Sequence, residues 1–321
     1  MPFSYDSPAL RELEELLQRE GLCTTVRRGE QMAAHTTLRI GGPAQLFAVP
    51  RSIQAAADCI NAARGLGVPL LVVGNGSNLL VSDEGIEGLV LSLKGLEKIE
   101  CDGNRITAAA GVPLGTLAAT ARDHGLSGLE FAAGIPGTVG GGVLMNCGAY
   151  GGEMKDVVES SLVLDKKGNL SALKAKLHGF AYRHTALMGE GDIVLASTFR
   201  LTPADPAGIT ARMEDLARQR RDRQPLNLPS AGSTFKRPEG HFAAKLIDDC
   251  GLKGRSVGGA AVSDKHAGFI VNTGEATAAD MLALMAQVQS VVLRETGVQL
   301  EPEVRFVGIP QSGSERDGQL G

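Results

Sequence analysis

VGNGSNLLV, at residues 73–81, is the stretch of this sequence that decides the fold. A second glycine-rich stretch, GIPGTVGGG, follows at residues 134–142 and is continued by NCGAYG at 146–151. Glycine lets backbone amides approach a ligand closely and adopt positive φ, and successive amides form concave sites for anions such as phosphates. Two such loops predict an extended ligand that contains a pyrophosphate, such as a dinucleotide, although either loop alone is equally typical of a tight turn.

The first loop stands at the end of a strand–helix–strand unit. Residues 46–49 predict a strand, residues 52–64 a helix and residues 70–73 a short buried strand. The loop follows that last strand, and α/β folds place ligands at the carboxyl ends of strands. It is not a Rossmann fingerprint, because Leu79 occupies the last glycine position of G-x-G-x-x-G and residues 79–81 predict a strand where a helix is required.

Strands dominate the next part of the chain. They are predicted at residues 89–93, 98–101, 105–109, 157–164 and 193–201. A helix over residues 114–124 lies between them, and DKKGN at 165–169 predicts a hairpin turn. This pattern indicates an α+β domain around the second glycine loop.

Helices frame the two ends of the chain. Ser7-Pro8 predicts a capped amphipathic helix that ends at Gly21, and Asp205-Pro206 predicts a helix to about Arg223 that opens a further domain. That domain is expected to contain a helix at 242–250, a strand at 269–272 and a long capped helix at 277–295. The apolar face of the long helix is predicted to be core and comprises Met281, Leu284, Met285, Val288 and Val292. Residues 309–321 are polar and glycine-rich, and we expect them to be disordered.

Composition and charge restrict the class of protein. At 321 residues the chain is long enough for roughly two or three domains, and its net charge of −4 gives no reason to expect a nucleic-acid partner. No apolar run approaches the length of a membrane span, and residues 1–7 lack the features of a signal peptide. The five cysteines and six histidines show no disulfide-framework or metal-ligand spacing. We therefore expect a cytoplasmic protein with reduced thiols, no metal and no membrane contact.

Seven stretches, taken together, resemble the UDP-N-acetylenolpyruvoylglucosamine reductases, a family of flavoenzymes of peptidoglycan synthesis. They are HTTLRIGG at 35–42, VGNGSNLLV at 73–81, GIPGTVGGGVLMNCGAYGGE at 134–153, YR at 182–183, SAGSTFKRP at 230–238, KHAGFIVN at 265–272 and EPEVRFVG at 301–308. They occur in the family's order, and the resemblance covers the chain from about residue 22 to 308. The resemblance implies an α+β fold, with a two-part FAD-binding module of the vanillyl-alcohol-oxidase (PCMH-type) class and a C-terminal α/β substrate-binding domain. The domains expected on that basis are an N-terminal helical extension at 1–21, the two FAD-binding subdomains at 22–92 and 93–204, and the substrate domain at 205–308.

The resemblance also implies a reaction. NADPH would reduce non-covalently bound FAD, and hydride would then pass from flavin N5 to the β carbon of the enolpyruvyl ether of UDP-N-acetylglucosamine, giving UDP-N-acetylmuramate. The expected ligands are these small molecules, and no obligate protein partner is evident. Two alternatives stay open: an oxidase of the same flavin fold, and a non-catalytic nucleotide-sugar-binding protein, which would be colourless.

Three residues match the family's catalytic positions. Ser233 matches the proton donor to the substrate's α carbon, Arg183 the residue that polarises the substrate carboxylate, and Glu303 their acidic partner. Glu303 is interpreted as either an acid or an organiser of the polar network. Taken singly, the three are more typical of a turn serine, a surface ion pair and an exposed strand glutamate than of catalytic residues.

The flavin and substrate contacts follow from the same resemblance. The positions that match flavin contacts are Thr37, Arg39, Ile40, Gly74, Asn75, Gly76, Ser77, Asn78, Leu79, Gly111, Gly134, Ile135, Gly137, Thr138, Gly141, Asn146, Gly148 and Ala149. The first loop contains no histidine, the residue through which some relatives attach flavin covalently, so non-covalent FAD is expected. The positions that match substrate contacts are Tyr182, Arg220, Arg223 and Lys236.

Two features depart from the family's usual pattern or carry a second interpretation. The arginines at 218–223 are placed to contact a diphosphate, but basic residues in a last helical turn also stabilise the helix dipole. Arg223 stands where the family usually has lysine, which leaves the geometry of that contact open. No tyrosine lies between Arg183 and Ser233, so the chain resembles the shorter subgroup that lacks a tyrosine-bearing loop, and the way it closes over the sugar is not predicted.

Overall fold

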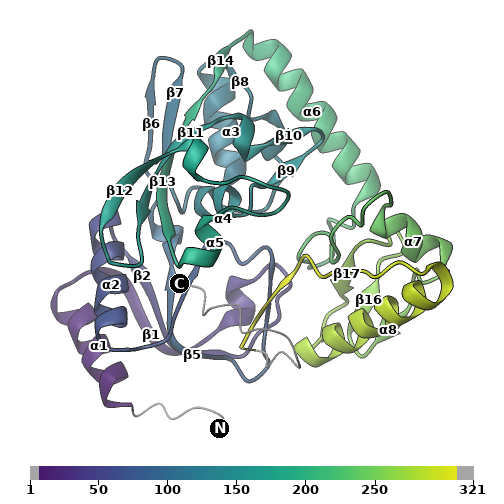
Figure 1. Ribbon diagram of the computed structural model, residues 1–321, viewed down its shortest axis with the longest axis horizontal. Helices are drawn as coiled ribbons and strands as arrows, with labels where there is room; N and C mark the ends of the chain where they lie inside the picture. Colours follow the sequence, from purple (N-terminus) through teal and green to yellow (C-terminus); the bar gives the residue numbers. More distant parts are fainter. Residues whose placement is uncertain (1–6, 309–321) are drawn as a thin grey trace.

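Two sheets lie side by side in the main body of this computed structural model, and a smaller domain with its own sheet stands beside them (Figure 1). The structure describes residues 7–308. The predicted tail at 309–321 lies outside the described residues. The first lobe holds the N-terminal part of the chain, the second lobe the middle part, and the C-terminal domain most of the rest.

The first lobe is built on a four-stranded sheet in the order β1-β2-β5-β3. Its elements are α1 (Pro8–Arg19), β1 (Cys23–Gln31), β2 (Pro43–Pro50), α2 (Ile53–Gly65), β3 (Leu70–Val73) and β5 (Ile86–Ser92). Strand β1 runs antiparallel to β2, whereas β2, β5 and β3 are mutually parallel. Leu13 and Leu17 of α1 are fully buried in one core with Ile60 of α2, so α1 is an integral part of this lobe.

The second lobe is an antiparallel sheet in the order β12-β11-β13-β7-β6. Its strands are β6 (Ile99–Asp102), β7 (Arg105–Ala109), β11 (Val158–Leu164), β12 (Leu170–Lys174) and β13 (Ile193–Arg200). The helices are α3 (Leu114–Asp123), α4 (Val139–Leu144) and α5 (Leu187–Glu190), and the short strands are β8 (Leu126–Ser127), β9 (Gly148–Ala149), β10 (Gly152–Glu153) and β14 (Thr202–Pro203). The predicted turn at 165–169 joins β11 to β12, where the Asp165 carboxylate accepts hydrogen bonds from the backbone N–H groups of Lys167 and Asn169.

The C-terminal domain packs two helices against a three-stranded sheet. Its elements are α7 (Ala243–Asp249), β15 (Ser256–Val257), β16 (Ala260–Val262), β17 (Ile270–Asn272) and α8 (Ala278–Thr296). The side chains of Thr277 and Asp280 form the reciprocal capping box at the start of α8. The apolar face predicted for this helix is buried in the domain's core.

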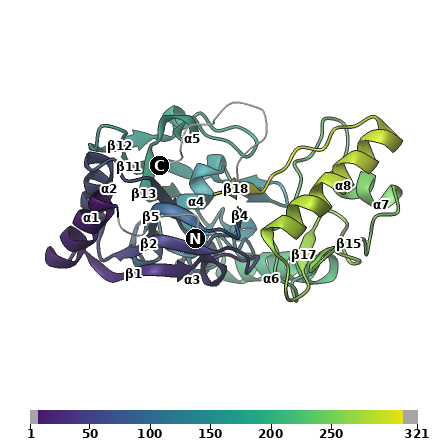
Figure 2. The same ribbon diagram turned by 90° about the horizontal axis from the view of Figure 1, so that it is seen from below.

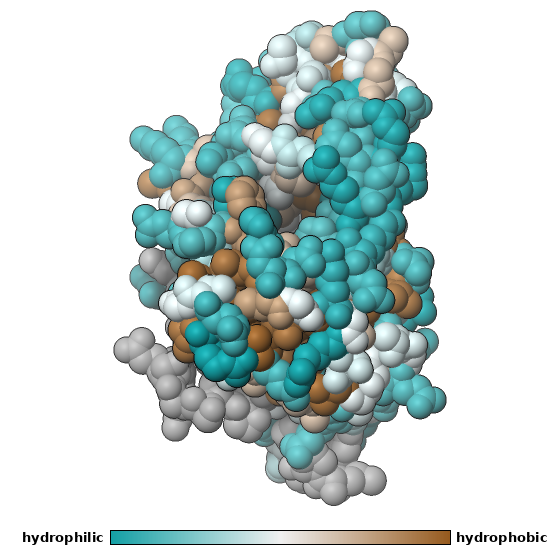
Figure 3. Space-filling model, turned by 90° about the vertical axis from the view of Figure 1, so that its right-hand side faces the viewer, coloured by the Kyte–Doolittle hydropathy of each residue, from teal (hydrophilic) through white to brown (hydrophobic). Residues whose placement is uncertain are grey.

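Two segments join the C-terminal domain to the main body. Helix α6 (Pro206–Arg223) packs against α3 and β8 of the second lobe, and buries only Ile209 and Leu216. The side of the molecule that carries the C-terminal domain is largely hydrophilic (Figure 3). The chain then returns through β18 (Arg305–Val307), which pairs in parallel with β4 (Leu79–Val81), directly after the first glycine loop (Figure 2).

Most of the predicted elements are confirmed, and some have the predicted first and last residues. Strand β3 spans residues 70–73 as predicted, and Ser52 caps α2 by accepting a hydrogen bond from Ala55 N. The cap predicted at the N-terminal helix is wrong, because the Ser7 side chain makes no capping hydrogen bond; Pro8 in the first turn marks the start of α1. No helix in the described part of the chain is long and apolar enough to cross a bilayer.

Candidate active site

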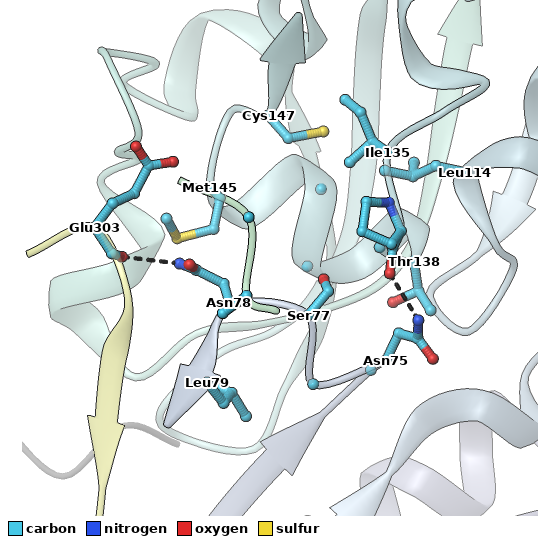
Figure 4. A pocket seen from close by; sticks show the side chains of 18 of the residues that line it. Asn75, Ser77, Asn78, Leu79, Leu114, Ile135, Thr138, Met145, Cys147 and Glu303 are labelled. Atoms are coloured by element: carbon cyan, nitrogen blue, oxygen red, sulfur yellow. Dashed lines mark hydrogen bonds between the residues drawn. The ribbon is translucent and has the colours of Figure 1, made fainter. Parts of the chain in front are cut away.

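A cavity of about 300 Å³ lies where both lobes meet the C-terminal domain (Figure 4). A smaller cavity of about 80 Å³ shares six lining residues with it: Val72, Val73, Gly74, Thr138, Gly141 and Leu144. The larger cavity collects most of the predicted site from distant parts of the sequence. The predicted residues that line it are Gly74, Asn75, Gly76, Ser77, Asn78, Leu79, Ile135, Gly137, Thr138, Gly141, Gly148, Ala149, Arg183, Arg220, Ser233 and Glu303.

The two glycine loops form one continuous wall of this cavity. Asn75 Nδ2 donates to the carbonyl oxygen of Pro136 at 2.7 Å, which ties the first loop to the second (Figure 4). A Cβ atom on Gly74 would lie 2.2 Å from Thr138 Oγ1, so the close approach of the loops requires glycine there. The two loops were predicted to belong to separate FAD-binding subdomains, at 22–92 and 93–204, and the fold brings them into contact.

The first loop presents unused hydrogen-bond donors. Within residues 7–308, the backbone N–H groups of Asn75, Gly76, Ser77 and Asn78 donate no hydrogen bond. Gly76 has a φ of +59°, and a Cβ at this position would lie 2.2 Å from the carbonyl oxygen of His35. Successive free amides in a turn that only glycine can adopt form a concave site for an anion, so these residues fit the pyrophosphate of a dinucleotide.

Arg183 and Glu303 form an ion pair across the cavity wall. Arg183 Nε donates to Glu303 Oε1 at 2.6 Å, and Nη2 lies 3.4 Å from the carbonyl oxygen of Gly148. Both side chains are largely buried, at 23% and 13% exposure. Burial alone would lower the pKa of Arg183, but the charge and the hydrogen bond of Glu303 hold that pKa above its ordinary value.

Ser233 reaches the same cavity through a glycine turn. Gly232 has a φ of +76°, and the chain after it pairs with the segment that carries Glu303, since Glu303 N donates to Thr234 O at 2.8 Å. Ser233 is exposed and lines the cavity. Its Oγ makes no hydrogen bond in the part of the chain that the structure describes, so the hydroxyl is available to a ligand.

Arg220 occupies another part of the cavity wall. It lines the cavity together with Gln224, whereas Arg223 is exposed and does not line it. Burial lowers the pKa of Arg220, with the Tyr150 hydroxyl opposing the shift, and no carboxylate pairs with it among residues 7–308. Gln224 Oε1 is buried without a hydrogen-bond partner there. A half-buried guanidinium without a counter-charge suits an anionic ligand.

Several predicted flavin contacts lie behind the wall instead of on it. Thr37 Oγ1 donates to Ser230 O at 2.7 Å, Ile40 is buried in the core of the C-terminal domain, and Arg39 has a φ of +56°. Gly111 packs so tightly that a Cβ there would lie 2.0 Å from Leu93 O. None of these lines the cavity.

The remaining predicted contacts are also outside the lining. Gly134 lies under the Arg220 side chain, and Asn146 is 1% exposed with its carboxamide bonded within the protein. Tyr182 is 52% exposed, and Lys236 pairs with Glu301 on the surface. The cavity instead has lining residues that were not predicted: Val72, Val73, Leu114, Pro136, Gly142, Leu144, Met145, Cys147, Gln224, Ala231, Gly232, Phe269 and Arg305.

Cys147, in the stretch NCGAYG, is a lining residue for which the sequence predicts no role. Burial raises the pKa of its thiol to about 12, so it is a neutral, apolar part of the wall at physiological pH. No group of three metal-binding side chains occurs within residues 7–308.

Comparison with known proteins first defines the class. A family described as "FAD binding domain" matches residues 44–174, the segment that contains both glycine loops. The protein is therefore an FAD-binding protein, and its two-part module confirms the predicted fold class.

The remaining matches define the family. "UDP-N-acetylenolpyruvoylglucosamine reductase, C-terminal domain" matches residues 224–307. The chain is 48% identical over 312 residues to UDP-N-acetylenolpyruvoylglucosamine reductase from Agathobacter rectalis, covering 93% of this chain and 98% of that one. It is 47% identical to the enzyme of the same name from Limosilactobacillus fermentum, over 91% of this chain and 99% of the relative. The chain is also similar to the crystal structure of UDP-N-acetylenolpyruvylglucosamine reductase from Thermus caldophilus. That match covers 88% of this chain and 99% of the Thermus caldophilus chain, with 37% sequence identity and a TM-score of 0.77. The chain belongs to the UDP-N-acetylenolpyruvoylglucosamine reductases, FAD-dependent oxidoreductases of peptidoglycan precursor synthesis.

Proposed function

We propose that this protein reduces the enolpyruvyl ether of UDP-N-acetylglucosamine to UDP-N-acetylmuramate with NADPH as reductant. The observation that carries the proposal is the convergence of Ser233, Arg183 and Glu303 on one cavity walled by the two glycine loops. An oxidase that shared only the flavin fold would have no need of this set. A binding protein would not need an unbonded hydroxyl that lines the same cavity as a largely buried ion pair.

The residues that would hold FAD are the first loop, Asn75 to Asn78, and the facing residues Gly137, Thr138 and Gly141. The free backbone N–H groups of residues 75–78 provide donors for a pyrophosphate, and the glycines at 76, 137 and 141 leave space for it. When bound, FAD supplies the redox chemistry by taking a reducing equivalent from NADPH and passing it to the β carbon of the substrate. No histidine stands in the first loop, which supports non-covalent binding.

Arg183 is placed to bind and polarise the substrate carboxylate. Its Nε is committed to Glu303 and its Nη2 faces Gly148 O, while Nη1 has no partner within residues 7–308. The cation therefore keeps donor capacity toward the cavity while Glu303 fixes its orientation. A fixed cation of this kind stabilises negative charge that develops on the substrate during reduction.

Ser233 is the candidate proton donor to the α carbon. A serine hydroxyl is a weak acid, so it can give up its proton only to a strongly basic, electron-rich carbon. Arg183 would stabilise the negative charge on the substrate until the proton is transferred. The Oγ of Ser233 is exposed and makes no hydrogen bond within residues 7–308, so the hydroxyl is free to approach the α carbon. Glu303 acts in this scheme as the organiser of Arg183.

Arg220 is the candidate contact for the diphosphate of the substrate. It is half-buried, lines the cavity and has no carboxylate partner in the described chain. Tyr182, Arg223 and Lys236 remain proposed substrate contacts. They are exposed and do not line the cavity, so they would approach the ligand only after a rearrangement of their side chains.

The test separates the two half-reactions under anaerobic conditions. In Ser233→Ala, flavin reduction by NADPH should stay near the wild-type rate, because no protein acid takes part in it. Flavin reoxidation by the enolpyruvyl substrate should slow by ~10²–10⁴-fold, the usual effect of a lost general acid. Ser233→Cys should recover part of the rate, since a thiol can also donate a proton. If Ser233→Ala slows both steps alike, or neither, Ser233 is a structural residue and the proposal loses its proton donor.

A further inference from the structure

Arg183 stands in a strained backbone conformation at the tip of a tight turn. Ala181 N donates to His184 O at 2.9 Å, and His184 N to Ala181 O at 3.3 Å, so residues 181–184 form a two-residue hairpin, here called the Arg183 hairpin. Arg183 has a φ of +54°, in the left-handed region that a side chain disfavours. Such conformations persist only where surrounding contacts impose them, and they cluster at functional sites.

Those surrounding contacts come from the end of the second glycine-rich stretch. Residues 144–148 provide three attachment points to the hairpin region. Asn146 Nδ2 donates to Ala181 O at 3.0 Å, Thr185 Oγ1 donates to Leu144 O at 2.8 Å, and Arg183 Nη2 faces Gly148 O. Thr185 is fully buried and Asn146 nearly so, which shields two of these bonds from water.

Both hydrogen-bond donors of the Asn146 carboxamide are used by acceptors within the protein. Its two Nδ2 hydrogens go to Ala181 O and Glu153 Oε2, the latter at 2.9 Å, and its Oδ1 accepts from Lys155 N at 2.9 Å. An asparagine amide has only two donors, so none is left for a cofactor. The side chain does not line the cavity.

We infer that Asn146 is a positioning residue that acts through Arg183: by holding the Ala181 carbonyl it fixes the Arg183 hairpin, and thereby the guanidinium, in its place against Glu303. The assignment rests on the proposed function, because it matters only if Arg183 binds the substrate. It replaces the flavin-contact role predicted for Asn146 from the sequence.

The test uses the flavin-loaded enzyme and two variants of Asn146. Asn146→Gly removes the carboxamide but tolerates the φ of +42° at this position. Asn146→Asp keeps the oxygen that accepts from Lys155 N but loses both donors. Asn169→Asp, in the exposed hairpin turn between β11 and β12, serves as the control. Both Asn146 variants should retain wild-type flavin content and wild-type reduction by NADPH. Reoxidation by substrate should slow roughly tenfold in Asn146→Gly, the loss expected when one net hydrogen bond no longer holds Arg183 in place. It should slow more in Asn146→Asp, whose new carboxylate oxygen faces Glu153 Oε2 and Ala181 O.

A double-mutant cycle with Arg183→Lys decides whether Asn146 acts through Arg183. If it does, Asn146→Gly should cost much less in the Arg183→Lys background than in the wild type. Additive effects, or loss of flavin in Asn146→Gly, overturn the inference. If Asn146→Gly does not fold, the same cycle is run with Asn146→Asp. Unchanged turnover in Arg183→Lys alone would contradict the proposed function, whereas a loss there with no effect in either Asn146 variant contradicts only the present inference.

Discussion

Gly141→Leu should stabilise the flavin-free protein slightly while it weakens flavin binding. Gly141 is the third residue of α4, has no positive φ, and a Cβ built on it meets nothing within 4 Å. Replacing a helical glycine by a good helix former gains at most about 1 kcal/mol, which corresponds to a rise in apparent Tm of at most about 2–4 °C. Gly141 also lines both cavities, so the open space around its Cβ is cavity space.

A leucine side chain there occupies part of the cavity of about 300 Å³ that the cofactor needs. Overfilling a packed site costs about 1–3 kcal/mol, which weakens flavin binding roughly 5- to 150-fold. The matched control is Gly208→Leu. Gly208 is likewise the third residue of its helix, α6, with no positive φ and nothing within 4 Å, but it lines neither cavity. The control should show the gain in Tm without the loss of flavin.

Two measurements check this prediction: apparent Tm of the flavin-free proteins by calorimetry, and flavin affinity by fluorescence titration. Gly141→Leu must raise the apparent Tm of the flavin-free protein and lower its affinity for flavin. Wild-type flavin affinity in Gly141→Leu would refute the placement of the cofactor against α4. Equal loss of flavin affinity in both variants would refute the claim that the effect is local.

Three other results are expected. Acid or heat precipitation should leave the yellow colour in the supernatant, and colour retained in the pellet would indicate a covalent flavin. Glu303→Gln should lower substrate turnover about tenfold, because it replaces a charge-assisted hydrogen bond to Arg183 by a neutral one. Glu303→Ala, which removes the hydrogen bond altogether, should lower turnover clearly more. Equal losses in the two variants would instead favour a role for Glu303 as an acid. Cys23 and Cys59, whose sulfur atoms lie 3.6 Å apart, should form a disulfide on exchange with a small-molecule disulfide, because their hydrogen bond lowers the pKa of Cys23. Intact mass should then show loss of two hydrogens, and a mixed adduct that persists on Cys23 in wild type would contradict that expectation.

Local signals in the sequence predicted local structure well. The four apolar residues 70–73 are a strand to the residue, and the Thr277–Asp280 pair is the capping box of α8. The helix at 206–223 was also predicted, but its packing was not. Its two buried residues face the second lobe, and this choice of partner depends on surfaces far away in the sequence.

Long-range contacts account for what the sequence could not show. Strand β18 pairs with β4 although more than two hundred positions separate them. A strand of only three residues, such as β4, carries no sequence signal that identifies the strand it will pair with. That pairing is what brings Glu303 to the cavity. The same limit explains Asn146, whose place in a glycine-rich stretch suggested a ligand contact, while its buried hydrogen bonds serve Ala181.

The two sides of the cavity are held in different ways. On the side of the first lobe, Asn78 both donates to Glu303 O at 3.0 Å and accepts from Arg305 N at 2.9 Å, and the Asp83 carboxylate accepts from Ala278 N at the start of α8. The loop whose free backbone amides line the cavity is thus the loop that fixes Glu303.

On the side of the second lobe, Arg237 N reaches the Tyr182 hydroxyl at 3.4 Å, a long bond between exposed residues. Ser233 and Glu303 lie on two paired segments, one of which is hydrogen-bonded directly to the first glycine loop. Arg183 approaches them from the opposite lobe, on a hairpin that needs its own anchors. The proposed chemistry needs Arg183 and Ser233 at the same substrate, with Glu303 holding Arg183. The anchoring of the Arg183 hairpin against residues 144–148 therefore positions Arg183 from the second lobe, as the β4–β18 pairing positions Glu303 from the first.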